Sequence, residues 1–193
     1  MTQLLPRAFV EHSFMNVMLL PGYIVIDTVS ENSAMDALNI LREALGTLPC
    51  LPLRTRIPPY SLLTDWLRAH AAPGKLSIGT ECLLQDDDDG QIRIRGLDLD
   101  SEQARNHLQA GMIVSRLSLQ HDQRGKNSEG MAYFELDDKM VLRRIDLADL
   151  PTVQAEDHYE ELQGSLAIVG GAMAALLSEL VTSFGGVDDP TTF

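Results

Sequence analysis

Two arginines separated by one residue occupy a short stretch with the composition of a β-strand, "QIRIRG". Side chains two residues apart project from the same face of a strand, whereas neighbours point to opposite faces. Arg93 and Arg95 are therefore expected on one face, and Ile92 and Ile94 on the other. The pattern predicts a strand that buries isoleucine and presents two guanidinium groups.

A second strand, "MIVSRLSL", places a further arginine among apolar residues. Ile113, Leu117 and Leu119 alternate with their neighbours, which predicts that these three side chains face the core. Arg116 would then lie on the opposite face, together with Val114.

A third stretch, "VLRRIDL", adds Arg143 and Arg144. If the three strands are neighbours in one sheet, their arginines line a single surface of the protein. Guanidinium groups form paired hydrogen bonds to phosphate oxygens and release counterions, so such a surface is suited to a nucleic-acid backbone. Spacing alone, however, favours a simpler interpretation, in which charged residues occupy the wet side of a half-buried sheet.

The acidic clusters could in principle hold a metal ion for a nuclease. Four consecutive aspartates, Asp86–Asp89, precede Gly90, and "EDHYEE" places His158 and Glu161 one helical turn apart. Adjacent carboxylates in a turn repel one another and point in different directions, which favours a solvated turn. Acidic residues in the first turn of a helix are favoured by its dipole, which explains the second cluster. We expect no metal site, and a metal-dependent exonuclease remains the alternative.

The remaining sequence excludes several classes of function. The 193 residues carry a formal net charge of −13, which disfavours indiscriminate binding to nucleic acid or acidic membranes. The motifs of nucleotide-cofactor sites and of hydrolase serines are missing, so no cofactor is expected. The sequence therefore favours a non-enzymatic function without deciding the question.

Cys50 and Cys82 have no paired spacing, as expected for reduced thiols in the cytoplasm. The longest uncharged apolar run, 165–178, is shorter than the roughly 20 residues of a membrane span.

The elements expected to position these residues alternate irregularly between strands and helices. Turn residues Pro21 and Gly22 predict a hairpin, and a serine-capped helix follows from Ser30 to Gly46. Further expected elements are a short helix at 60–70, strands at 76–84 and 91–95, a helix from Ser101, a strand at 112–121, a second hairpin at 131–147 and a long helix from about Glu156. We predict an α+β fold of antiparallel hairpins with packed helices and a long C-terminal helix. We expect the chain to be organised in three structural regions, 1–75, 76–150 and 151–193.

The order of several longer stretches resembles one protein family. The stretches are "LLPRAF", "LREALGTLPCLPL", "LTDWLR", "IRIRGLDLDSEQARNHLQAG", "VSRLSL" and the closing "GSLAIVGGAMAALLSELVTSFGG". Together they are similar, in this order, to the recombination-associated protein RdgC, and the resemblance covers nearly the whole chain. The chain corresponds to the C-terminal two thirds of the family protein.

The resemblance implies a bacterial, nucleoid-associated and cytoplasmic protein that binds duplex DNA without sequence specificity. It implies a ring-shaped homodimer that encircles DNA, restrains recombinase activity and uses Phe9 at a dimer contact. Some family labels mention an exonuclease. Basic residues of the family correspond to Arg95, Arg116, Arg143 and Arg144, and with Arg93 these form the expected DNA-binding set.

The sequence also departs from the family pattern at several basic positions. Gly96, Leu97, Met112 and Asp146 stand where the family carries basic or polar side chains. Each change removes positive charge, which suggests a third hypothesis: a shortened relative that acts only through protein contacts.

Overall fold

The computed structural model describes residues 13–96, 99–124, 130–153 and 157–188. The chain forms two compact units, Met1–Pro49 and Cys50–Phe193. The three-segment division expected from the sequence remains a prediction about the organisation of the chain.

Over residues 13–49, the first unit contains a two-stranded hairpin and one helix. Strands β1 (Val17–Leu20) and β2 (Tyr23–Ile26) pair antiparallel, and Gly22 in the turn has a φ of 82°. Helix α1 (Glu31–Leu45) begins after Ser30, whose side chain accepts a hydrogen bond from the amide of Ser33, and ends at Gly46. The cap and turn residues therefore act as their chemistry predicts.

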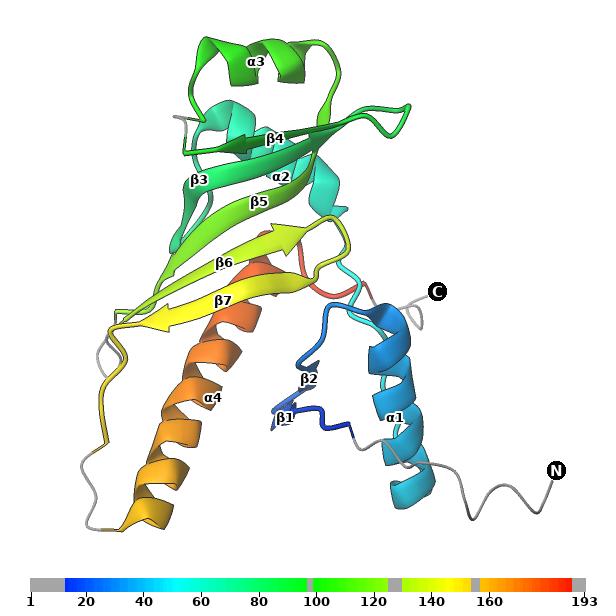
Figure 1. Cartoon of the computed structure of the whole chain (residues 1–193), viewed down its shortest axis with the longest axis vertical. Coiled ribbons are helices and arrows are strands. Elements are labelled where there is room, and N and C mark those ends of the chain that lie inside the picture. The colour runs from blue at the N-terminus through cyan, green and yellow to red at the C-terminus, as the bar shows by residue number, and fades with distance from the viewer. Residues whose placement is uncertain (1–12, 97–98, 125–129, 154–156, 189–193) are drawn as a thin grey trace, which may run out of the picture. The chain divides into compact units, whose positions relative to one another are not determined.

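The second unit is built on a five-stranded antiparallel sheet with the strand order β4-β3-β5-β6-β7 (Figure 1). Its strands are β3 (Leu76–Gln85), β4 (Gln91–Arg95), β5 (Ile113–Asp122), β6 (Met131–Asp137) and β7 (Leu142–Ala148). Its helices are α2 (Pro59–Ala69), α3 (Glu102–Gln109) and α4 (His158–Ser183). The predicted α+β class, with antiparallel sheets and a long C-terminal helix, is confirmed.

Helices contribute to the core on one face of this sheet. The ring centroids of Trp66 on α2 and Phe184 after α4 lie 5.1 Å apart, and both residues are buried. The core combines these aromatic rings with apolar side chains from the sheet and the three helices: Leu63, Leu67, Leu84, Leu108, Val114, Leu117, Leu119, Phe134, Leu136, Leu176 and Leu180. The opposite face of the sheet is thereby left for polar side chains.

Only the C-terminal half of α4 belongs to this core. Near the start of the helix, Leu162 and Leu166 are 49% and 57% exposed, whereas Leu176 and Leu180 are fully buried. Among the described residues, α4 alone meets the length and apolar composition of a membrane span. A core helix of a globular protein meets the same test, and the second half of α4 packs in this way.

One hydroxyl group joins α2 to β5. Thr64 is 3% exposed, and its Oγ1 donates to the carbonyl oxygen of Tyr60 at 2.6 Å and accepts from the amide of Val114 at 2.9 Å. Val114 adjoins an irregularity in the β3–β5 pairing, where a strand amide can lose its ladder partner. The threonine therefore satisfies a buried backbone donor.

We expect Thr64→Val to lower the free energy of unfolding of the second unit by about 1–3 kcal/mol, because the buried amide of Val114 loses its acceptor. Thr64→Ser keeps the hydroxyl and serves as the matched control, with a smaller loss. Urea unfolding followed by the fluorescence of Trp66, the single tryptophan, reports on this unit alone. Equal losses in the two variants would contradict the role of the hydrogen bond.

A histidine is buried between the sheet and α4. His121 on β5 is 2% exposed, and its Nδ1 has no hydrogen-bond partner among the described residues. Burial lowers the pKa of His121 from its usual 6.5, and the positive charge of Lys75 lowers it further, while Glu179 and Asp122 act in the opposite direction. The imidazole is therefore held in its neutral form.

The stability of the second unit should consequently fall in mild acid. Below pH 6.5 the unfolded histidine binds a proton that the folded one rejects, so unfolding is favoured by up to about 1.4 kcal/mol per pH unit. The free energy of unfolding, measured by urea titration between about pH 5 and 7.5, should show this slope against pH. His121→Leu should lose it, whereas the control His158→Gln, at an exposed site, should keep it. An unchanged slope in His121→Leu would exclude His121 as its source.

Candidate nucleic-acid interface

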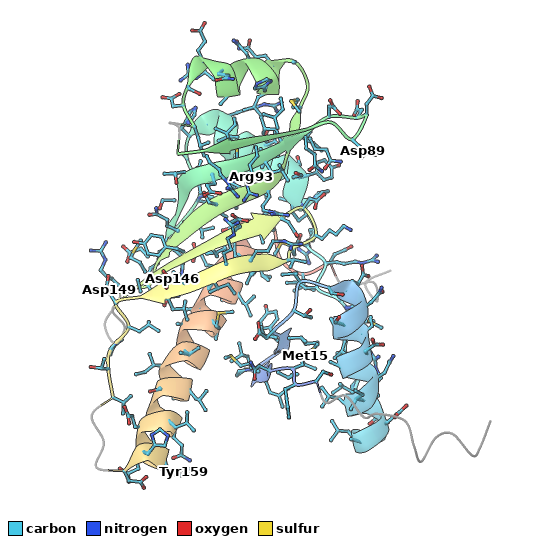
Figure 2. All side chains as sticks on the ribbon, in the orientation of Figure 1. Met15, Asp89, Arg93, Asp146, Asp149 and Tyr159 are labelled. Atoms are coloured by element: carbon cyan, nitrogen blue, oxygen red, sulfur yellow. The ribbon has the colours of Figure 1, made fainter. Side chains whose placement is uncertain are left out.

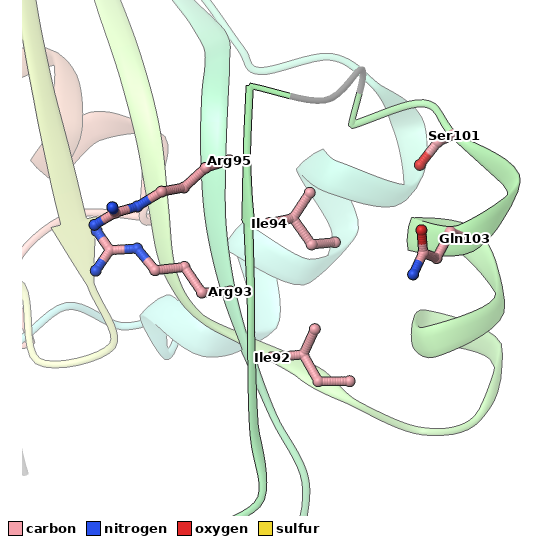
Figure 3. A pocket seen from close by; sticks show the side chains of 6 residues that line it. All are labelled: Ile92, Arg93, Ile94, Arg95, Ser101 and Gln103. Carbon is pink, nitrogen blue, oxygen red and sulfur yellow. The ribbon is translucent and has the colours of Figure 1, made fainter.

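The five arginines singled out from the sequence project from one face of the sheet. Arg93 and Arg116 both pair with Leu83 of β3, from opposite sides, so their side chains share a face. Figure 3 shows Arg93 and Arg95 pointing to one side of β4 and Ile92 to the other, as their alternation predicts. On β7, Arg143 forms an ion pair with Asp137 and Arg144 forms one with Glu135, and both acids lie on the face of Arg116.

The face of Arg116 was predicted correctly, but part of its strand was not. Val114 is fully buried, whereas Ile113 is 38% exposed, which reverses the prediction for these two residues. The reason is a shift in register: Leu83 pairs with Arg116 and Leu84 with Val114, so Ser115 is an extra residue. Such a bulge exchanges the faces of the residues that precede it.

A second bulge explains how two consecutive arginines reach one face. Neighbouring residues of a regular strand point to opposite faces. In β7, however, the register shifts between the pairs Tyr133–Asp146 and Glu135–Arg143. Arg144 lies within this bulge with a φ of 51°, a left-handed conformation that is uncommon for residues other than glycine. Its Nη1 thereby comes to lie 2.9 Å from Oε1 of Glu135.

Glu135 on β6 is the buried centre of the arginine cluster. Its side chain is 7% exposed, and Nη1 of Arg144 donates to it at 2.9 Å. Terminal nitrogens of Arg93 and Arg116 lie 3.5 Å from its two oxygens. A buried carboxylate is tolerated only when opposite charges and hydrogen bonds compensate it, and three guanidinium groups do so here.

Glu81 on β3 is a second, more exposed centre. Its Oε2 lies 3.3 Å from nitrogens of both Arg93 and Arg95 and 3.6 Å from Nη1 of Arg144, and its side chain is 31% exposed. The backbone amide of Glu81 donates to Oγ of Ser118 at 2.8 Å. A Cβ on Gly79 would lie 2.5 Å from that hydroxyl oxygen, so the close approach of β3 and β5 requires glycine.

Asp137 differs from the two glutamates because one of its oxygens accepts backbone amides. Oδ2 accepts from Nε and Nη2 of Arg143 at 3.1 and 2.9 Å, and Oδ1 accepts from the amides of Lys139 and Val141 at 3.0 and 2.9 Å. This carboxylate therefore holds the turn between β6 and β7 and fixes Arg143 beside it.

We call these eight residues the arginine face: Arg93, Arg95, Arg116, Arg143, Arg144, Glu81, Glu135 and Asp137. Every arginine has an acidic partner, but five guanidinium groups share three carboxylates, which leaves an excess of two positive charges. The side chains of Arg95 and Arg144 are 54% and 57% exposed, whereas those of Arg116 and Arg143 are 26% exposed.

The acidic members of the arginine face were not predicted from the sequence. The alternation of Tyr133, Glu135 and Asp137 in "MAYFELDD" would have placed both acids on one face of β6. Their proximity to the arginines depends on the strand order, which pattern alone does not give.

The four aspartates form a turn, as predicted. Asp86–Asp89 connect β3 to β4, and Oδ1 of Asp86 accepts from the amides of Asp88 and Gly90 at 3.0 and 2.6 Å. Figure 2 shows Asp89 at the tip of this hairpin. At the start of α4, Nδ1 of His158 lies 3.7 Å from Glu161, while Glu156 is outside the described residues. Among the described residues, no group of three or more His, Cys, Asp or Glu side chains could hold a metal ion.

The other sites named from the sequence add no chemistry to this surface. Burial raises the pKa of the Cys82 thiol to about 11, so that thiol stays protonated. Phe9, the expected dimer contact, lies outside the described residues. A hollow of ≈ 430 Å³ follows the edge strand β4 and is lined by side chains from both faces of that strand and from the start of α3 (Figure 3): Ile92, Arg93, Ile94, Arg95, Ser101 and Gln103.

Comparison with known proteins places this chain in a family. Residues 1–187 match the family model described as "Putative exonuclease, RdgC". The chain is 36% identical over 196 residues to the recombination-associated protein RdgC of Pseudomonas aeruginosa strain PAO1, with 97% of this chain and 62% of the relative covered. The proteins of the same name from Pseudomonas syringae pv. tomato and Pseudomonas putida are 34% and 31% identical, with 96% of this chain and 61% of each relative covered. The chain thus spans about three fifths of the length of these curated relatives, and it belongs to the RdgC family.

Proposed function

We propose that this chain binds duplex DNA through the arginine face, by contacts to the phosphate backbone that do not read the base sequence. The observation that carries the proposal is the cluster of five guanidinium groups around three carboxylates that forms the arginine face. Guanidinium groups bind phosphate oxygens through several parallel hydrogen bonds, and such contacts fix position without specifying sequence.

The five arginines do not contribute equally to this proposal. Arg143 is hydrogen-bonded to Asp137, and the side chains of Arg143 and Arg116 are only 26% exposed. Arg95 and Arg144 are more than half exposed, so their nitrogens can reach an external phosphate without unfolding the sheet. We therefore assign the main phosphate contacts to Arg95 and Arg144, with Arg93 between them.

The relatives are named as recombination-associated proteins, and we propose that this chain acts in the same process at the bacterial nucleoid. A homodimer that surrounds DNA, with Phe9 at a contact, is part of the proposal. Because the chain spans about 62% of the relatives' length, closure of a ring is a separate property from phosphate binding by one subunit.

A second candidate function is supported by the same surface. Every arginine of the face has a carboxylate partner, and the formal net charge is −13. These observations favour a protein that has lost DNA binding and acts through contacts with other subunits. The two functions differ in one measurable property, because the first requires salt-dependent affinity for DNA.

Titration of a labelled duplex of about 20 base pairs should show binding that weakens between about 50 and 200 mM salt, equally for unrelated sequences. Arg95→Ala combined with Arg144→Ala should weaken binding about fivefold or more and reduce the salt slope by about 2. Arg68→Ala with Arg105→Ala removes the same charge from α2 and α3, and should leave the slope unchanged. No binding at low salt, or equal effects of both double variants, would overturn the proposal.

The same complex tests the exonuclease named in the family description. Binding without cleavage predicts that end-labelled DNA stays intact when Mg²⁺ or Mn²⁺ is added. Loss of label that disappears when Asp86–Asp89 are replaced by alanine would instead support the metal-dependent enzyme.

A further inference from the structure

One oxygen atom lies at the point where three guanidinium groups converge. Oε2 of Glu81 is 3.3 Å from Nη2 of Arg93, 3.3 Å from Nε of Arg95 and 3.6 Å from Nη1 of Arg144. The arginines come from β4 and β7, the two edge strands of the sheet, so their long side chains reach inward to a common point between those edges. Several donors arranged around one anionic oxygen are the usual surroundings of a bound phosphate.

The three carboxylates of the arginine face differ in how firmly they are held. Glu135 is 7% exposed and enclosed by three arginines. Asp137 is equally buried, and its second oxygen accepts two backbone amides. Glu81 is 31% exposed, and its carboxylate forms ion pairs with Arg93, Arg95 and Arg144 and accepts no backbone amide among the described residues.

We propose that the Glu81 carboxylate is an internal occupant of a phosphate subsite, and that a phosphate group of the ligand displaces it. The subsite consists of Arg93, Arg95 and Arg144, and the ligand is a phosphate group carried by DNA or free in solution. This inference rests on the proposed function, because it names the contact point and its regulation on the same face.

The displacement has a physical consequence for affinity. The three guanidinium groups are already neutralised in part, so an incoming phosphate exchanges one set of ion pairs for another. Exposed ion pairs are weak and screened by salt, which makes the exchange possible without disrupting the sheet. Glu81 thereby limits the affinity of the subsite for a phosphate group, and removal of its carboxylate should increase phosphate binding.

Three variants separate displacement from a general change of charge. Glu81→Gln removes the carboxylate charge from the convergence point. Glu81→Asp keeps the charge but shortens the side chain by one methylene, so its oxygens withdraw from the three guanidinium groups. Asp146→Asn is the matched control, because Asp146 lies on β7 (Figure 2) and pairs with Tyr133, which shares the face of Glu135.

Affinity for a labelled duplex and for inorganic phosphate should be measured for the parent and the three variants, with folding checked by the fluorescence of Trp66. Glu81→Gln should bind DNA about five- to tenfold more tightly than the parent, with a salt slope larger by about 1. Glu81→Asp should also bind more tightly, although its net charge is unchanged. Asp146→Asn should change affinity by less than about twofold.

The outcomes distinguish this inference from the proposed function. If the parent binds DNA and both Glu81 variants match Asp146→Asn, the phosphate subsite is refuted and the proposed function stands. If the parent fails to bind DNA but Glu81→Gln binds it, the subsite is supported and the parent's DNA binding is refuted. Binding of inorganic phosphate alone by the Glu81 variants supports the subsite and excludes DNA as its ligand. If neither the parent nor any variant binds either probe, both proposals fail.

Discussion

The buried carboxylate of Glu135 is the interaction on which the arginine face depends. A charge that is 7% exposed is costly unless opposite charges surround it, and Arg93, Arg116 and Arg144 supply them from three different strands. The constraint acts in both directions. The arginines allow the carboxylate to be buried, and the carboxylate fixes the long side chains of the arginines, which would otherwise lose conformational entropy on binding a ligand.

Irregular strand pairing is what brings these groups together. A regular β7 would turn Arg143 and Arg144 to opposite faces, but the bulge at Arg144 lets both reach the acids of β6. On the other side of the sheet, the bulge at Ser115 turns Val114 into the core. There, Oγ1 of Thr64 accepts a hydrogen bond from the backbone amide of Val114. One bulge therefore shapes the polar face of the sheet, and the other helps to close the apolar core.

Much of the local structure could be predicted from the residues themselves. Ser30, Ser101, the Pro21-Gly22 turn and the aspartate turn act through local chemistry, and the structure places each as predicted. The faces of Arg93, Arg95 and Arg116 followed from strand alternation. The bulges were not predictable in this way, because they depend on which strands pair and where the register shifts. For the same reason, the sharing of three carboxylates among five arginines became visible only once β3, β6 and β7 were placed in one sheet.

The balance of charges on this face also bears on how an acidic chain can bind an acidic polymer. Screening reduces interactions beyond about 8 Å at physiological ionic strength, so a phosphate at the sheet responds to the nearby cluster more than to the net charge of −13. In the proposed complex, however, each phosphate contact would replace an internal ion pair, which would keep the net gain in binding free energy small. Weak contacts that exchange readily, and that involve no bases, allow a protein to hold many sequences alike. The carboxylates of the arginine face are thus compatible with DNA binding, because they favour a loose and salt-sensitive association over a tight one.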